Sequence, residues 1–287
     1  MIQICNPPDI LFVTTLPYKL LGSRVIFDYH DTCPELYEFG KYGLAHSLLV
    51  FFERLTFKVS DVVITANDGF QNLAITRGGK NQDDVFTVYS VPNLSSFPVI
   101  APQIRRPGRV VIGYVGVMGK QDGVCNLVHA VTLLRQRNPE IDILCRLVGD
   151  GPELTKVQRL VEECQAKDVF DFTGFVTGDE LLRQLGSFDI GVIPDSPDIY
   201  NDQISMNKVF EYMAIGIPIV SFRLSETMRL LGNAGTYATE PTPASLADAL
   251  LVESPELRAS RGQSAAKRFA ANFSLRHDGL RFGSRGM

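Results

Sequence analysis

The sequence of 287 residues lacks the features that mark several large classes of protein. Its formal net charge is only −4, and no run mixes basic and aromatic residues, so nucleic acid is not an expected partner. The five cysteines form no C-x-x-C pair, which favours free thiols in a reducing cytoplasm, with Cys145 as a small core residue. The opening MIQICNPPDI does not resemble a secretory signal, and no stretch is apolar over about 18 residues, as a membrane-spanning helix requires.

Short β-branched segments alternate with helical patterns in the first part of the chain. We expect strands in ILFVTT (10–15), RVIFDYH (24–30), DVVITAN (61–67) and DVFTVYSVPN (84–93), with a helix through 44–60. Crossovers of this length between strands predict parallel pairing, and therefore an α/β sheet. The segment SSFPVIAPQIRRPGR, with three prolines and little periodicity, is typical of a linker between domains.

The same alternation begins again after this segment. We expect five further strands, in RVVIGYVG (109–116), DILCRLVG (142–149), VFDFTGFV (169–176), FDIGVIP (188–194) and IPIVSF (217–222). Helices are expected between them, including one from about Val124 to Arg137, and again after about Pro243. The predicted fold is α/β with two Rossmann-like parallel-sheet domains. We place a partial first domain at 1–100, a second domain at 101–262 and a helical tail at 263–287.

Several glycines follow predicted strands, at the edge of an open parallel sheet where ligands bind. GVMGKQDG places Gly116 and Lys120 after one strand, and GDGPE places Gly149 after the next. Glycines let a backbone approach a diphosphate closely, and a helix N-terminus offers unpaired N–H groups to it. The alternatives are ordinary tight turns beside a solvated lysine. After a third strand, Phe175 and Val176 form either a flat slot for a nucleobase or a core turn.

The segment SMNKVFEYMAIGIPIVSF brings charge to the same edge of the sheet. Lys208 and Glu211 are three residues apart on a predicted short helix, where a surface ion pair worth a few tenths of a kcal/mol is one interpretation. The other is that an anion meets Lys208 and the helix N-terminus, while Glu211 accepts hydrogen bonds from two ribose hydroxyls. A nucleotide would satisfy both demands of this second interpretation.

The chain resembles family 4 of the retaining glycosyltransferases. The resemblance is carried by four motifs in a fixed order and spacing: GYVGVMGKQDG, VGDGPE, GFV and SMNKVFEYMAIGIPIV. The resemblance implies the GT-B fold, in which two domains face a cleft and a sugar moves from a nucleotide diphosphate to an acceptor without a metal. No cofactor is implied beyond the nucleotide-sugar donor. The family's opening strand and Gly-rich loop have no counterpart before Met1, so we expect the first domain to be incomplete.

The resemblance also implies roles for individual residues. Glu211 resembles the second acid of the family's E-x7-E motif, and the first acid is replaced by Gln203. Ile204, Ser205 and Met206 would lie beneath the sugar and diphosphate, and Gly116 would face the phosphates. The lysine that commonly follows the glycine loop is replaced by Asp122, which leaves Lys120 and Lys208 as the cations that stabilise the leaving diphosphate.

In the first domain, VIFDYHDTCPE places His30 after a strand, where the family has a histidine that contacts the donor sugar. The alternative is a structural histidine. Retention without an obvious nucleophile implies front-face attack, with the leaving phosphate accepting the proton of the acceptor.

The resulting prediction is a glycosyltransferase of polysaccharide or glycan biosynthesis in the cytoplasm or at the inner membrane face. Its expected partners are a nucleotide sugar and a saccharide or lipid-linked acceptor. Peripheral membrane contact through the aromatic-rich segment 44–60 is an alternative to a core helix there. Two alternative functions are a donor-binding subunit that needs a partner for the acceptor half, and a sugar-nucleotide epimerase. The exposed edge of the incomplete sheet could pair with another chain or with a second copy of this one.

Overall fold

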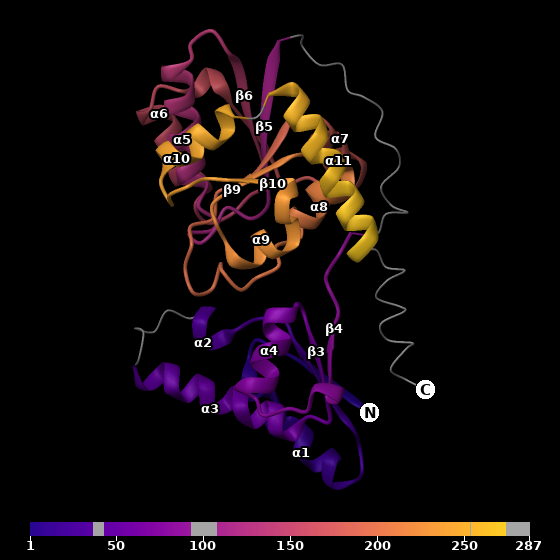
Figure 1. Cartoon of the computed structure of the whole chain (residues 1–287). Coiled ribbons are helices and arrows are strands. Elements are labelled where there is room, and N and C mark those ends of the chain that lie inside the picture. Colours follow the sequence, from indigo (N-terminus) through magenta and orange to yellow (C-terminus); the bar gives the residue numbers. More distant parts are fainter. Residues whose placement is uncertain (37–42, 93–107, 253, 274–287) are drawn as a thin grey trace. The chain divides into compact units, whose positions relative to one another are not determined.

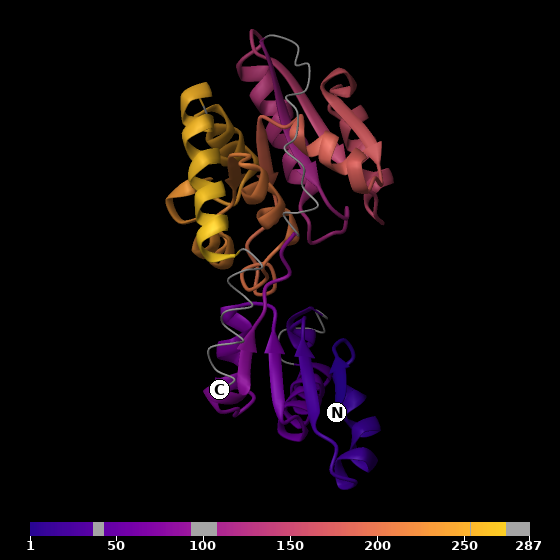
Figure 2. The same cartoon turned by 90° about the vertical axis from the view of Figure 1, so that its right-hand side faces the viewer.

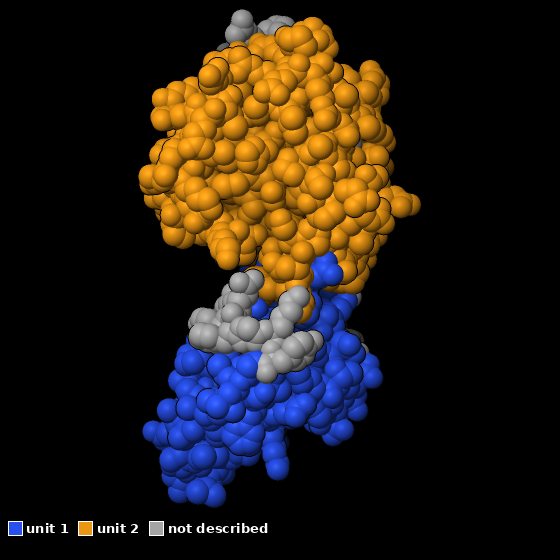
Figure 3. Space-filling view, turned by 90° about the vertical axis from the view of Figure 1, so that its left-hand side faces the viewer, with its two compact units in different colours: residues 1–90, 202–205, 278–287 blue, residues 91–201, 206–277 orange. Residues whose placement is uncertain are grey.

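The computed structural model describes residues 1–36, 43–92, 108–252 and 254–273, and it contains two compact units (Figure 3). Unit 1 holds Met1–Ser90 together with Asp202–Ser205. Unit 2 holds Val91–Asn201 and Met206–His277. Each unit has its own parallel sheet, as the sequence predicts.

The predicted domain boundaries compare with the structure as follows. The linker expected at 95–109, and with it the boundary after residue 100, lies outside the described residues except for its last two positions. The tail expected to begin at residue 263 starts inside one continuous helix, α11 (Pro255–Asn272), which packs against α8 (Asn207–Ile215).

Unit 1 is built on a four-stranded parallel sheet in the simple order β1-β2-β3-β4. The strands are β1 (Ile2–Cys5), β2 (Val25–Tyr29), β3 (Val62–Thr65) and β4 (Val85–Thr87). Its helical elements are η1 (Asp9–Leu11), α1 (Phe12–Leu20), α2 (Cys33–Leu36), α3 (Leu44–Val59), α4 (Asp68–Thr76) and η2 (Gln82–Asp84). Since parallel crossovers are right-handed, sequential order places α1, α3 and α4 on one side of the sheet (Figures 1 and 2).

The core of unit 1 lies between that side of the sheet and its helices. Along β2, the side chains of Val25, Phe27 and Tyr29 are buried, whereas those of Ile26 and Asp28 are only partly buried. Phe27, Tyr29 and Phe57 of α3 form edge-on or tilted ring contacts at centroid distances of 5.0–5.5 Å. One face of helix α3 is therefore part of the core, which favours a core helix over peripheral membrane contact for segment 44–60.

The strand expected at 10–15 is wrong. Ile10 and Leu11 belong to η1, and residues 12–15 begin α1, while the first strand is β1 at Ile2–Cys5. A short apolar run does not distinguish a strand from a buried helix segment. Here Phe12 and Thr15 are buried and Val13 is exposed, which is the spacing of a helix face.

Unit 2 contains a six-stranded parallel sheet in the order β10-β9-β8-β5-β6-β7. Its strands are β5 (Arg109–Val115), β6 (Asp142–Val148), β7 (Phe170–Gly174), β8 (Ile190–Ile193), β9 (Ile219–Ser221) and β10 (Gly235–Tyr237). The sequence analysis predicted the first five of these. It did not predict β10, whose three residues directly follow a short 3-10 helix at Gly232–Ala234.

Helices cover both faces of this sheet (Figure 1). On one face α5 (Val124–Arg137) packs between α6 (Leu154–Glu163) and α10 (Pro243–Leu251). On the other, α8 packs against α7 (Gly178–Gly186) and α11. The remaining elements are η4 (Lys167–Val169), α9 (Ser225–Leu231) and η5 (Gly232–Ala234). The main core includes Cys145, which is fully buried as predicted.

The strand order of unit 2 reverses at β5. From β5 the chain proceeds to β6 and β7 on one side, and β8, β9 and β10 then lie on the other side. In an open α/β sheet, this switch point leaves a crevice beyond the carboxyl ends of the two central strands.

Among the described residues no helix has the length and hydropathy to cross a membrane, and all five cysteines are free thiols.

Candidate functional site

The loops that follow β5, β6 and β7 are joined by backbone hydrogen bonds. The N–H of Gly116 donates to Val148 O at 3.0 Å, and the N–H of Gly149 donates to Gly174 O at 2.9 Å. Gly149 has φ +133°, and a Cβ atom there would lie 1.9 Å from the carbonyl oxygen of Gly116. A side chain at Gly149 is therefore excluded by the close approach of the two backbones. The predicted glycine turns do converge at one edge of the sheet.

The loop after β8 is fastened to the loop after β5. Gly123, with φ +62°, packs against Pro194 so closely that a Cβ atom would lie 2.1 Å from the carbonyl oxygen of Pro194. The buried side chain of Asn201 donates to Gln121 O at 3.0 Å and to Ser196 O at 2.9 Å. These contacts hold the two loops on either side of the switch point in a defined arrangement.

Lys208 lies at the centre of this edge, but it is buried rather than solvated. Its Nζ is 3.0 Å from a carboxylate oxygen of Asp195, 3.5 Å from Asp122, and 4.7 Å from the centroid of the Tyr114 ring. Burial raises the pKa of Asp195 to about 6, although Lys208 opposes that shift. Neither Asp195 nor the supporting Tyr114 was among the predicted site residues. The sequence feature that could have identified Asp195 is its position two residues after the buried strand β8.

The surface ion pair between Lys208 and Glu211, considered as one interpretation of the sequence, is not formed. Lys208 instead pairs with Asp195 and Asp122. Among the described residues no hydrogen bond or ion pair holds the Glu211 carboxylate, which is partly buried on α8. Burial raises the pKa of Glu211 against the lowering influence of Lys208. A desolvated carboxylate without a hydrogen-bond partner can accept donors from a ligand.

Helix α8 begins next to this cluster. Its N-cap residue is the buried Met206, which makes no side-chain capping hydrogen bond. The N–H groups of the first helical turn and the positive end of the helix dipole are thus not satisfied by a side-chain cap. Lys120 is exposed in the turn before α5, and Phe175 is 77% exposed just after β7, followed by the partly buried Val176.

The remaining predicted residues belong to unit 1. Although it lies between β8 and α8 in sequence, the segment Asp202–Ser205 groups with this unit. The side chain of Asn67 donates to Gln203 O at 2.8 Å, and Ile204 packs at the margin of the unit 1 core. Ser205 is partly buried.

His30 also belongs to unit 1 and follows β2, as predicted. Its side chain is 49% exposed, and its Nε2 lies 3.1 Å from Asp28 Oδ1. Its backbone N–H donates to Asn6 Oδ1 at 2.8 Å.

Of the residues predicted for the site, the structure therefore brings Gly116, Gly149, Lys208 and Glu211 together within unit 2.

The chain is similar in sequence to known glycosyltransferases. The chain matches the family described as Glycosyl transferases group 1 over residues 109–252, about half of its length. It is 29% identical over 188 residues to a D-inositol 3-phosphate glycosyltransferase of Pseudarthrobacter chlorophenolicus, covering 61% of this chain and 44% of the relative. It is 25% identical over 172 residues to an α-D-kanosaminyltransferase of Streptomyces kanamyceticus, covering 58% and 42%. The chain therefore spans less than half the length of these curated relatives.

Solved structures resemble the whole fold. A sucrose-phosphate synthase from Thermosynechococcus elongatus superposes with a TM-score of 0.76 at 17% identity, covering 98% of this chain and 71% of that one. HepE of Anabaena, solved in complex with UDP and glucose, also gives a TM-score of 0.76 at 15% identity, covering 98% and 76%. With its two Rossmann-like parallel sheets and its match across the switch-point loops of unit 2, the chain belongs to the Glycosyl transferases group 1 family and has the GT-B fold.

Proposed function

We propose that this chain acts in a glycosyltransferase that moves a sugar from a nucleotide-diphosphate sugar to an acceptor. One observation carries the proposal: the glycine loops, the start of α8 without a side-chain cap, and the carboxylate of Glu211, which bonds to none of the described residues, occur together at the switch point of unit 2. A nucleoside diphosphate needs backbone N–H groups for its phosphates and an acceptor for its ribose hydroxyls. This edge offers both.

The roles in donor binding are assigned as follows. Glu211 accepts hydrogen bonds from the ribose hydroxyls, and Gly116 and Gly149 let the backbone approach the phosphates. Ile204, Ser205 and Met206 lie beneath the sugar and diphosphate. The exposed ring of Phe175, with Val176, provides an apolar surface for the base. Gln203, which stands in place of an acid, can donate hydrogen bonds to the sugar and accept hydrogen bonds from it, but it brings no charge.

The charges around Lys208 bear on its role at this edge. Lys208 already faces two carboxylates, at 3.0 and 3.5 Å, so that cluster carries one more negative charge than positive when all three groups are ionised. An incoming diphosphate gains little from a cation neutralised in this way. We assign Lys208 to holding the loops after β5 and β8 in place, and Lys120 to the charge that develops on the leaving diphosphate.

The reaction is proposed to retain the anomeric configuration and to need no metal. The bond from the anomeric carbon to the phosphate oxygen breaks as the acceptor hydroxyl attacks the same face, and its proton passes to the leaving phosphate oxygen. The names of the relatives, which refer to inositol phosphate and aminosugar chemistry, favour a polyhydroxylated acceptor. His30 is proposed to contact the donor sugar, and the product to be a polysaccharide or other glycan made in the cytoplasm.

A panel of donors tests the proposal directly. Thermal-shift measurements with UDP-, GDP- and ADP-sugars should raise the melting temperature with one base and not with the others, because a ligand that binds the native state stabilises it. Calorimetry with that donor should then give a 1:1 complex. If no sugar nucleotide binds at millimolar concentration, the proposal is wrong.

Hydrolysis of a radiolabelled donor separates the alternatives. Slow release of free sugar indicates a transferase, whereas affinity without turnover indicates a donor-binding subunit. Conversion of the donor into another sugar nucleotide without any acceptor indicates an epimerase.

A further inference from the structure

A second group of chemically reactive side chains lies in unit 1, on the sheet face opposite the core. In the parallel ladder Cys5 of β1 pairs with Asp28 of β2. Successive side chains of a strand point to opposite faces, so Cys5 and Asp28 lie on the face that Val25, Phe27 and Tyr29 do not use. His30 follows Asp28 by two positions, at the carboxyl end of the same strand. The ladder register therefore brings a thiol, a carboxylate and an imidazole together.

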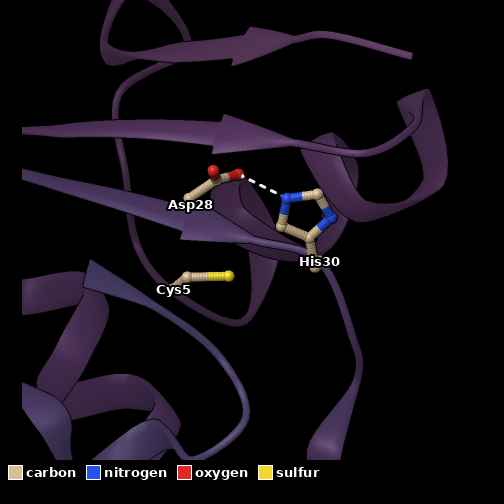
Figure 4. A group of neighbouring side chains, drawn as sticks. All are labelled: Cys5, Asp28 and His30. Carbon is tan, nitrogen blue, oxygen red and sulfur yellow. Dashed lines mark ion pairs between the residues drawn. The ribbon is translucent and has the colours of Figure 1, made fainter. Parts of the chain in front are cut away.

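These three side chains point toward one another (Figure 4). One ligand atom from each, the Cys5 Sγ, a carboxylate oxygen of Asp28 and a ring nitrogen of His30, all lie within 4.8 Å of one another. His30 Nε2 and Asp28 Oδ1 are 3.1 Å apart. Ligands that surround a zinc ion tetrahedrally at its usual bond lengths are about 3.3–3.8 Å apart. Side-chain rotations that move these ligand atoms by about 1 Å would bring them to that spacing.

The surroundings hold two of the ligands in place. Gln3 Nε2 donates to the other carboxylate oxygen of Asp28 at 2.9 Å. The backbone N–H of His30 donates to the buried Asn6 side chain, which in turn donates to Asp31 O. The bond from Gln3 to Asp28 is of the kind that orients metal ligands in proteins, whereas the bonds of Asn6 fix the backbone that carries His30. The carboxylate of Asp28 also acts electrostatically on Cys5, and its negative charge beside the thiol favours a cation.

The chemistry of the three ligands selects the ion. Mg²⁺ and Ca²⁺ prefer oxygen ligands alone, whereas a thiolate with an imidazole and a carboxylate suits Zn²⁺ or Co²⁺. Cys5 and His30 are exposed, so an ion can reach them from solvent. We propose that Cys5, Asp28 and His30 form a binding site for a divalent transition-metal ion of the zinc type, with its fourth position open to water or another ligand.

The site lies outside residues 109–252, over which the family match extends, and it does not depend on the proposed transfer reaction. An ion bound to His30 Nε2 would remove that nitrogen from any contact with a sugar. The effect on activity, unlike the metal site itself, rests on the proposed contact of His30 with the donor sugar: bound zinc would reduce turnover. Nucleotide affinity should change little, since Gly116, Gly149 and Glu211 belong to unit 2.

Cobalt provides the test, because a thiolate bound to Co²⁺ gives a near-ultraviolet charge-transfer band. The full chain, kept reduced in a chelator-free buffer, is titrated with Co²⁺ by absorbance and with Zn²⁺ by calorimetry. We expect one ion per chain and a thiolate band. In Cys5→Ser the band should disappear, and in both Cys5→Ser and His30→Gln the Zn²⁺ affinity should fall more than about 100-fold, since loss of outer hydrogen bonds alone costs about 10- to 100-fold.

Matched controls come from unit 2. Cys164→Ser and His129→Gln change a partly buried cysteine and an exposed histidine far along the sequence, and both should retain the band and the affinity. Circular dichroism of each variant checks that the fold is intact. Absence of the band in the wild-type chain, its persistence in Cys5→Ser, or an equal loss of affinity in the controls would each overturn the proposal.

Discussion

The two units differ in the topology of their sheets. In unit 2 the strand order reverses between β8 and β5, whereas the described strands of unit 1 run in sequential order from β1 to β4. In an open α/β sheet, such a reversal sends the loops after two neighbouring strands to opposite faces and leaves room for a ligand between them. Unit 2 therefore contains the kind of switch point beyond which ligands bind, and the described strands of unit 1 contain none. This difference explains why the converging glycines and Glu211 all occur in unit 2.

Each unit also buries an ionic cluster, and the two clusters differ in position. In unit 2 Lys208 joins Asp195 and Asp122 at the edge of the sheet. In unit 1 Arg77 bonds to Glu35 and Glu53, each at 2.6 Å, and Glu53 accepts a hydrogen bond from Tyr29. Glu53 lies on α3, and its side chain is fully buried. The first cluster joins the loops that follow β5 and β8, and the second joins helices to the core.

The largest expected effect concerns the cluster of unit 2. Asp195→Ala removes the nearer partner of a buried Lys208, and we expect the free energy of unfolding to fall by about 3 to 5 kcal/mol. Urea unfolding followed by circular dichroism measures it. Asp171→Ala, which removes a partly exposed partner of Arg146, is the control and should cost less than about 1 kcal/mol. Equal losses in the two variants would show that the buried cluster has no special weight.

The cluster of unit 1 predicts a pH dependence. Burial raises the pKa of Glu53 to about 7 from 4.5, against the lowering effects of Arg77 and Tyr29. The folded state therefore holds a proton that the unfolded state releases, and stability falls as pH rises from about 4.5 through about 7. Relative to wild type, Glu53→Gln should gain up to about 3 kcal/mol between pH 5 and pH 8. Urea unfolding at several pH values tests this, and a constant difference would contradict it.

A smaller effect is expected on ligand binding in unit 2. Glu211→Ala removes two hydrogen bonds from ribose hydroxyls to a charged group, so the affinity for the nucleotide should weaken by about 2 kcal/mol. Calorimetry with the nucleotide identified by the donor panel gives this value. Glu163→Ala, on the exposed face of α6, should bind like wild type. Unchanged affinity in Glu211→Ala would remove Glu211 from the site.

The smallest effect on nucleotide affinity is expected from unit 1. His30→Ala should lower turnover while affinity stays within about 0.5 kcal/mol of wild type, as for surface substitutions generally. Turnover is measured with a chelator present, so that metal binding does not contribute. His129→Ala is the matched control. Turnover equal to that of the control would mean that His30 is structural.

Much of unit 2 could be predicted from the sequence because its signals are local. Helix α5 has the predicted bounds, Val124–Arg137, since its apolar period of 3.6 is sustained over 14 residues. The glycine turns after β5 and β6 were predicted because only glycine allows backbones to approach so closely. Strand β10, with the sequence GTY, and helix α9, with seven residues, escaped prediction because neither lies in a sustained apolar pattern. The run ILFVTT was misassigned because six apolar or β-branched residues fit either period.

The sequence by itself determined the α/β class, the positions of most helices and strands, and the glycine turns, because hydrophobic period and backbone sterics act over a few neighbouring residues. Only the tertiary structure decided that Lys208 faces Asp195 instead of Glu211, and that Cys5 meets Asp28 and His30. Those contacts join residues that are distant in sequence, and they depend on strand order and register, which no local pattern records.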